Sequence, residues 1–366
     1  AFNDLEKHAN HVTLKDFFHR VDGKMTGENI SEKLSQFGTR LVFTAHPTQF
    51  YPPQVLDIIS KLRMLITEND INAIDITLQQ LGLTSLINTK KPTPPDEARN
   101  IIYFLRNIYY KAVGELFSHI KQDTRNPYFE NYNIIKLGFW PGGDRDGNPF
   151  VTAETTMQVA DELRMTLMKC YYADFKNLRR KLTFRETEDT LAEVQARLYP
   201  AMYDSEKTIR YENIIQPLLA VKSVLIEKYN SLYLDELDSL IDKVNIFRTH
   251  FAALDIRQNH DAHYQTVQEI LKKAGYIKQS LSELTPDELT GILLHENIQI
   301  HPDLYPDELV KDNIVNIAQL KLIQEKNGEE GCNRYVISNS EDIYAVLFVY
   351  ALFRWCGWET DSLTFD

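Results

Sequence analysis

Four short apolar runs, each followed by polar residues, constrain the fold of this chain more than any other feature. The runs are Leu41 to Thr44, Ile134 to Trp140, part of Phe247 to Ile256, and Tyr335 to Ile337. Each leads through a polar tip toward a helical pattern, and strand, tip and helix in repeated order are typical of a β/α barrel. A barrel has eight strands, whereas this sequence supplies about four. We therefore expect a mainly α protein with parallel β strands, in which a partial (β/α) barrel of about four strands is surrounded by helices.

Most of the remaining sequence has the three- and four-residue apolar spacing that predicts helices, most clearly from residue 153 to 182. The segment Thr285 to Glu288 matches a capping box with proline at the first helical position, so a helix should begin there. Gly275 and Gly328 are expected to end helices. No internal repeat or domain boundary is visible, so we treat residues 1–366 as a single unit.

The composition excludes several classes of protein. With 366 residues and 43% hydrophobic content, the chain can bury a large core. A formal net charge of -12 argues against a nucleic-acid surface, although a local basic pocket for an anionic metabolite is compatible with it. The three cysteines, Cys170, Cys332 and Cys356, show neither a disulfide framework nor zinc-ligand spacing. A reducing cytoplasm fits this cysteine usage best.

The two ends of the chain give further expectations. The amino terminus does not resemble a signal peptide, and no apolar run reaches the length of about 20 residues that spans a bilayer. We therefore expect a soluble cytoplasmic protein without membrane contacts. The chain starts at Ala1 in charged, helix-favouring sequence and stops at Asp366 without a closing cap, so we expect a piece of a longer protein.

His46 is the first candidate site residue. It follows the first apolar run and precedes Pro47, and a residue before proline is pushed away from helical dihedrals toward an extended conformation. His46 is therefore expected at a strand end, where barrel enzymes place catalytic groups. Titration near neutral pH favours catalysis, but a structural histidine in a turn would give the same pattern.

The segment from Gly138 to Pro149 is dense in glycine, aspartate and proline around Arg145. Glycines permit close backbone approach, so clustered backbone donors can cradle an anion that Arg145 would also bind. The alternative is a tight turn in which Asp144 and Asp146 merely orient Arg145. Trp140, which precedes this loop, is either an ordinary core aromatic residue or the wall of a pocket at the strand tip.

The third run ends in Leu254-Asp255-Ile256-Arg257-Gln258, which alternates at strand period, so that Asp255 and Arg257 project to the same side. This arrangement suggests a pair. Arg257 then either neutralises Asp255 or binds phosphate while Asp255 aligns it.

Two other polar patterns have ordinary structural interpretations. His260 and His263 are spaced like half of a metal site, but no further ligand pattern appears, so we interpret them as a helix start and surface residues. Ser338 and Glu341 match a capping box, which we take as their role.

Taken together, five segments resemble phosphoenolpyruvate carboxylase and occur in the order found in that family. They are FTAHPTQ at 43–49, KPTPPDEAR at 91–99, GFWPGGDRDGNPFVT at 138–152, LDIRQ at 254–258 and ISNSEDIYAV at 337–346. TAHPT and the glycine-rich string are individually specific. The resemblance covers nearly the whole chain and implies the amino-terminal half of an enzyme in which helices surround an eight-stranded barrel.

The resemblance also implies roles for four residues. His46 matches the family histidine that assists carboxyphosphate breakdown and carboxyl transfer, and Arg257 matches an arginine that holds the substrate phosphate. Trp140 matches an aromatic wall of the apolar pocket proposed for carbon dioxide, where exclusion of water would protect the enolate from protonation. Arg145 lies in the signature loop, where we infer that it stabilises charge.

For the full-length protein, the resemblance implies a carbon-carbon lyase that forms oxaloacetate and phosphate from phosphoenolpyruvate and bicarbonate. Such carbon dioxide fixation is anaplerotic and supplies the tricarboxylic acid cycle. The family's Mg or Mn would be bound by carboxylates outside this fragment, so the fragment alone should be inactive. The expected partners are the two substrates, the carboxy-terminal half of the same enzyme and, at full length, further copies in a homo-oligomer.

One departure and one alternative accompany the resemblance. After TAHPT the family continues with acidic and then paired basic residues, whereas this chain continues with Gln49 to Pro53, QFYPP. This puts in doubt any basic contact from that turn, and we prefer a divergent bacterial subgroup as the explanation. The alternative function is a non-catalytic helical scaffold or regulatory module that retains the family motifs.

Overall fold

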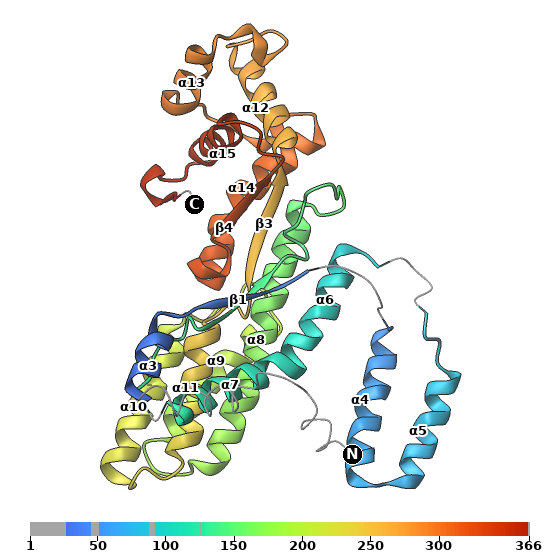
Figure 1. The fold of residues 1–366 in the computed structure, drawn as a ribbon, viewed down its shortest axis with the longest axis vertical. Coiled ribbons are helices and arrows are strands. Elements are labelled where there is room, and N and C mark those ends of the chain that lie inside the picture. Colours follow the sequence, from blue (N-terminus) through green and yellow to red (C-terminus); the bar gives the residue numbers. More distant parts are fainter. Residues whose placement is uncertain (1–26, 45–50, 88–91, 125, 127, 365–366) are drawn as a thin grey trace.

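The computed structural model describes residues 27–44, 51–87, 92–124, 126 and 128–364. Within these ranges the chain is mostly helical, with four strands between groups of helices (Figure 1). The strands are β1 (Thr39–Phe43), β2 (Ile135–Phe139), β3 (Ala253–Asn259) and β4 (Arg334–Ser338). The α-helices are α3 (Gly27–Gln36), α4 (Pro53–Glu68), α5 (Ile71–Leu83), α6 (Pro94–Phe104), α7 (Tyr110–Asp123), α8 (Ala153–Lys181), α9 (Glu188–Ala201), α10 (Glu212–Lys228), α11 (Leu234–Phe247), α12 (His260–Ala274), α13 (Pro286–His295), α14 (Glu308–Asn327) and α15 (Tyr344–Trp355). Shorter helical segments are the π-helix η1 (Leu105–Tyr109) and the 3-10 turns η2 (Leu281–Glu283), η3 (Pro302–Leu304), η4 (Glu329–Gly331) and η5 (Thr360–Ser362).

The four strands form one parallel sheet in the order β1-β2-β3-β4. This confirms the prediction of parallel strands in a mainly helical chain. Among the described residues the sheet is open, with β1 and β4 at its edges. The edge strands expose the apolar side chains of Leu41, Val42 and Val336, whereas β2 and β3 are mostly buried. An apolar edge of this kind favours association with further structure.

The third apolar run forms a strand only in its second part. Helix α11 continues to Phe247, and Arg248 then takes a φ of 51° before the strand begins at Ala253. Phe247 and Phe251 are buried, so the start of this run contributes side chains to the helical core rather than to the sheet. Strand β3 also extends beyond the run, to Asn259.

The helix ends follow the predicted signals. Helix α8 begins after Thr152, whose side chain accepts a hydrogen bond from the amide of Thr155. Helix α13 begins with the capping box of Thr285 and Glu288, and α12 ends at Gly275, which has the left-handed conformation at φ 85°. Gly328 follows the last residue of α14. No helix in the described ranges is long and apolar enough to cross a membrane.

Helix α8 is central to the packing. It contacts α6, α9, α11 and α14. Arg164 of α8 is completely buried and holds three parts of the chain together. Its nitrogens donate to Asp161 of the same helix, to Asn327 at the end of α14 and to the backbone oxygens of Ser205 and Lys207. Every polar contact of this buried cation is therefore made within the fold.

Helices α4 and α5 form a hairpin that stands away from the remaining helices in Figure 1. The two helices pack on each other. They expose several large apolar side chains, including Met64 (62%), Ile66 (63%), Ile71 (71%) and Ile76 (68%). Large apolar side chains exposed together are typical of surfaces that contact other protein.

The interpretation of His263 as a surface residue is wrong. His260 does begin α12, as predicted, but His263 is fully buried and its Nε2 lies 2.9 Å from the hydroxyl oxygen of Tyr335. Burial is the main cause that lowers the pKa of His263 to about 3. The residue contacts Tyr335 of β4 from a helix that packs on α14 and α15, which the spacing of two histidines could not reveal.

The capping box proposed for Ser338 and Glu341 is also wrong. Ser338 is the last residue of β4, Asn339 takes a φ of 58°, and the next helix begins only at Tyr344. The carboxylate of Asp342 instead accepts a hydrogen bond from the amide of Tyr344. The turn after β4 is therefore longer than the motif assumed.

Candidate functional site

The candidate site lies at the carboxyl ends of the strands. In a parallel sheet these ends share one edge, and the loops that follow them are brought together there. Trp140 follows β2, and Arg257 lies near the carboxyl end of β3. His46 lies two residues beyond Thr44, the last residue described after β1, and is outside the described residues. Its place relative to Trp140 and Arg257 is therefore a prediction from the sequence alone.

The glycine-rich loop after β2 is held against β3 by its backbone. The amide of Arg145 donates to the carbonyl oxygen of Arg257, and the amide of Arg257 donates to that of Gly143, each at 2.9 Å. A side chain at Gly143 would place a Cβ 2.1 Å from the carbonyl oxygen of Asp255, so only glycine fits there. Gly142 has a φ of 80°, which also favours glycine. The glycines thus permit the close approach of loop and strand that the sequence predicted.

Arg257 is held over the indole ring of Trp140. Its guanidinium carbon is 4.2 Å from the ring centroid, a cation-π contact, and its Nη1 lies 3.2 Å from a carboxylate oxygen of Asp144. The side chain is 24% exposed. Within the described residues, the contact with Asp144 is its one side-chain hydrogen bond. Because a guanidinium carries several N–H donors, the others can bind an anion from solvent.

Asp255 does not pair with Arg257, which corrects the pairing suggested by the sequence. Arg40 of β1 binds its two carboxylate oxygens at 2.6 and 2.7 Å, and Nε1 of Trp140 donates to it at 3.0 Å. Asp255 is 3% exposed, so its charge is neutralised by Arg40 inside the protein. Asp255 and Arg257 do share one side of β3, but each has its own partner of opposite charge.

Arg145 is buried on a different side of the loop. Its Nη2 lies 2.5 Å from Asp312 and 3.1 Å from Asn313, both on α14, and its exposure is 6%. The same Asp312 accepts a hydrogen bond from the amide of Ala153 at the start of α8. The interpretation that Asp144 and Asp146 orient Arg145 is therefore wrong.

A cavity of about 580 Å³ lies beside Arg145, lined by the loop after β2, the end of β3 and residues of α12 and α14. Neither Trp140 nor Arg257 lines it. Among the described residues, Nε and Nη1 of Arg145 are buried without a hydrogen-bond partner. The structure thus brings Trp140 and Arg257 together and places Arg145 at a separate cavity.

Two contributors to this region were missed from the sequence. Arg40 neutralises Asp255 across 215 residues of chain, and Asp312 holds Arg145 across 167. The alternation of β1 places Arg40 on one face of the sheet, but no sequence signal connects it with β3. In the described part of the chain, no group of three or more His, Cys, Asp or Glu side chains could hold a metal ion. The residues described here therefore do not fit the metal that the resemblance implies.

The fold and the site define an α/β protein in which a partly exposed arginine, stacked on tryptophan, lies at the carboxyl edge of a parallel sheet. A family model described as phosphoenolpyruvate carboxylase matches residues 3–210 and 184–365. The chain belongs to the phosphoenolpyruvate carboxylase family.

Curated relatives agree with this assignment. The chain is 27% identical to phosphoenolpyruvate carboxylases of two Haemophilus influenzae strains over 405 residues, which is 94% of this chain and 44% of the relatives. It is 24% identical to phosphoenolpyruvate carboxylase of a Synechococcus species over 412 residues, covering 90% of this chain and 39% of the relative. The chain therefore spans less than half the length of these relatives.

Proposed function

We propose that this chain is the amino-terminal part of a phosphoenolpyruvate carboxylase, which forms oxaloacetate and phosphate from phosphoenolpyruvate and bicarbonate. The observation that carries the proposal is Arg257, which is held by Trp140 and Asp144 at the strand ends with donors left over. A planar guanidinium of this kind suits the phosphate of the substrate.

The proposed chemistry divides among the site residues. Arg257 binds the phosphate group, and the part of the Trp140 indole that Arg257 leaves uncovered forms a wall of an apolar pocket for carbon dioxide, from which water is excluded. His46 exchanges a proton during carboxyphosphate breakdown and carboxyl transfer. For Arg145 we propose charge stabilisation through Nε and Nη1, which have no hydrogen-bond partner among the described residues, while Asp312 holds Nη2.

The remaining parts of the enzyme are proposed to come from outside this chain. The open sheet would be completed to an eight-stranded barrel by a carboxy-terminal half, which would cover the apolar side chains on β1 and β4. That half would also carry the carboxylates for Mg or Mn, so the fragment alone would be inactive. Residues 1–366 would act as one unit of a cytoplasmic, bacterial enzyme. The exposed apolar side chains of the α4–α5 hairpin are compatible with assembly of the full-length protein into a homo-oligomer.

The test uses the full-length protein and two substitutions. His46→Asn should abolish oxaloacetate formation, and Arg257→Gln should strongly raise the phosphoenolpyruvate concentration needed for half-maximal rate. The control is Arg185→Gln, at a surface arginine in the turn between α8 and α9. It should change neither oxaloacetate formation nor the phosphoenolpyruvate concentration needed for half-maximal rate.

The outcomes separate the two functions considered. If His46→Asn forms oxaloacetate at a near-normal rate, His46 is not a catalytic residue. If the unaltered full-length protein forms no oxaloacetate with Mg or Mn present, the proposal fails in favour of a non-catalytic helical scaffold or regulatory module.

A further inference from the structure

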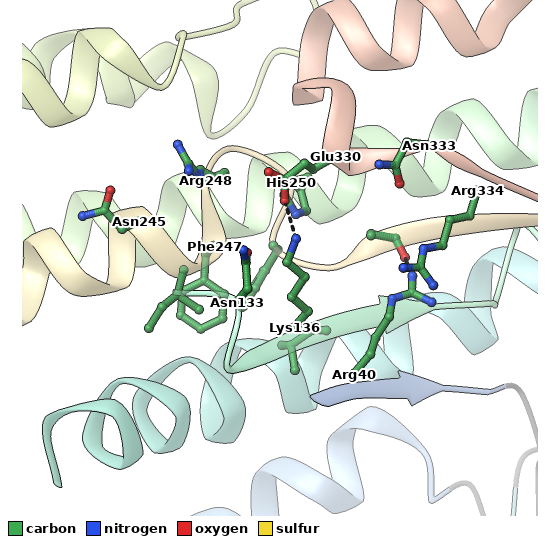
Figure 2. A pocket seen from close by; sticks show the side chains of 14 residues that line it. Arg40, Asn133, Lys136, Asn245, Phe247, Arg248, His250, Glu330, Asn333 and Arg334 are labelled. Atoms are coloured by element: carbon green, nitrogen blue, oxygen red, sulfur yellow. Dashed lines mark hydrogen bonds and ion pairs between the residues drawn. The ribbon is translucent and has the colours of Figure 1, made fainter. Parts of the chain in front are cut away.

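A second polar pocket lies at the opposite, amino ends of the strands. Its lining includes Arg40 of β1, Lys136 of β2, Arg334 of β4, and Arg248 and His250 from the turn before β3. Figure 2 shows these side chains arriving from different elements around one space. The cavity has a volume of about 60 Å³. At about 30 Å³ for each water molecule, that volume holds roughly two waters, or one small ion.

The charge of this pocket is opposite to that of the chain. Four cationic side chains line it against one carboxylate, Glu330 of η4, whereas the whole protein carries a net charge of -12. Lys136 pairs with Glu330 at 3.0 Å, and Arg40 pairs with Asp255 in the sheet behind the cavity. In the part of the chain that the structure describes, Arg334 and Arg248 make no ion pair with a carboxylate. Positive charge therefore remains in excess at this site.

His250 supplies a buried polar atom without a partner. The residue is 7% exposed, and among the described residues its Nδ1 has no hydrogen-bond partner. Burial is the main cause that lowers the pKa of His250 to about 4, and Lys136, Arg248 and Arg40 act in the same direction against the opposing charge of Glu330. The ring is therefore neutral near pH 7, and a neutral ring can donate one N–H to an anion.

The pocket is built from rigidly held parts. The hydroxyl of Thr249 donates to the backbone oxygen of Asn327 at 2.6 Å, which fixes the turn before β3 against the end of α14. Arg248 stacks over the ring of Tyr211 at 4.2 Å. A Cβ at Gly331 would lie 2.8 Å from the Cβ of His250, so η4 and its Glu330 pack directly on the same turn. The turn before β3 and η4 are thus preorganised around the cavity.

We propose that this pocket binds inorganic phosphate. The size of the cavity suits a single small oxyanion and leaves no room for a bulky ester. Donors approach from β1, β2, β4 and the turn before β3, and a tetrahedral anion offers acceptor oxygens in all of these directions, whereas a carboxylate is planar. Arg40 and Arg334 both line this space in Figure 2, and planar guanidinium groups suit the oxygens of a phosphate.

The phosphate pocket is separate from the candidate site at the carboxyl ends of the strands, but a chain of side-chain contacts links the two. Arg40 lines the pocket and binds Asp255, and Asp255 accepts the hydrogen bond of Trp140, which holds Arg257. A phosphate that draws the Arg40 guanidinium toward the cavity would weaken the ion pair between Arg40 and Asp255. Phosphate binding at the amino ends of the strands is therefore expected to change the environment of Trp140, near the carboxyl ends.

The test is equilibrium dialysis of the full-length protein against labelled inorganic phosphate at constant ionic strength. The unaltered protein should bind phosphate at a site that survives Arg257→Gln, a variant that removes the proposed substrate arginine. The double variant Lys136→Gln, Arg334→Gln should weaken this binding by about tenfold or more, since two charged donors are lost. Both side chains lie at the surface, so the fold should tolerate their replacement.

A matched double variant, Lys228→Gln, Arg197→Gln, removes two cations from surface ion pairs elsewhere and should leave phosphate binding unchanged. Equal affinity in the pocket variant and the unaltered protein would overturn the proposal, as would an equal loss in both double variants. Glycerol 3-phosphate should compete at least tenfold less well than inorganic phosphate, and equal competition would overturn the choice of ligand. Should the pocket variant not fold, crystals of the unaltered protein soaked in tungstate decide: a peak in this cavity supports the site and its absence overturns it.

Discussion

The guanidinium carbon of Arg257 lies 4.2 Å from the centroid of the Trp140 ring, while the indole nitrogen of Trp140 donates to Asp255 at 3.0 Å. One aromatic side chain therefore contacts two opposite charges that are two residues apart on β3. Asp255 is neutralised by Arg40, and the side chain of Arg257 makes a single hydrogen bond, to Asp144, in the described structure. This division of partners keeps Arg257 available to a ligand.

The two functions of Trp140 can be separated by substitution. Trp140→Phe keeps a ring under Arg257 but removes the donor to Asp255, which should lower the free energy of unfolding by about 1 kcal/mol. Trp140→Leu also removes the cation-π contact, which should cost about 1 kcal/mol more and release Arg257. We expect the leucine variant to need more phosphoenolpyruvate for half-maximal rate than the phenylalanine variant does. Equal behaviour of the two variants in denaturation and kinetics would show that stacking does not position Arg257.

Gly143 provides a test of the contact between loop and strand. Gly143→Ala would place a methyl group 2.1 Å from the carbonyl oxygen of Asp255, so β3 and the loop must separate. Loss of the two backbone hydrogen bonds there should cost at least about 2 kcal/mol and lower the midpoint of thermal unfolding. Gly291→Ala in α13 is the control, because a Cβ there meets no atom within 4 Å and alanine favours a helix. A Gly143→Ala protein as stable as the control would contradict this account.

The fold was predictable from the sequence where local signals dominate. The extent of α8, the end of α12, the start of α13 and the positions of β1, β2 and β4 follow from apolar periodicity, Gly275, Thr285 and short apolar runs. The start of β3 was not predictable, because Phe247 and Phe251 are as apolar as strand residues but pack among helices. A run of apolar residues reports burial, and only neighbours distant in sequence decide its backbone conformation.

The candidate site was predictable in its residues but not in its pairings. Alternation correctly placed Asp255 and Arg257 on one side of β3, and the dense glycines correctly indicated a close backbone approach. The partners of Asp255 and Arg145 are Arg40 and Asp312, which come from remote elements. Ion pairs depend on distance in space, and a charge near in sequence is only one of several candidates.

Arg40 should be essential to the stability of the sheet. Arg40→Met would leave Asp255, which is 3% exposed, without its cation, and an unpaired buried charge should cost about 3 to 5 kcal/mol. The double variant Arg40→Met, Asp255→Leu removes both charges and should recover most of this loss. Chemical denaturation of the four proteins of this cycle measures the coupling. If Arg40→Met alone unfolds at the same denaturant concentration as the unaltered protein, Asp255 does not depend on Arg40.

His263 should make the protein less stable in acid. Its pKa is lowered from 6.5 to about 3 in the folded state, chiefly by burial and further by His260 and Arg145. Between these two values the unfolded chain binds a proton that the folded chain does not, so stability falls as the pH drops below 6.5 and continues to fall until about pH 3. The contribution of this residue between pH 7 and pH 5 is a loss of about 2 kcal/mol. In His263→Gln, which can still bond the hydroxyl of Tyr335, this part of the pH dependence should disappear, whereas His301→Gln at an exposed position should retain it. The measurement is the denaturation midpoint of each protein from pH 7 to pH 5. If the midpoints of the unaltered protein and of His263→Gln change with pH in parallel, His263 titrates alike in the folded and unfolded states.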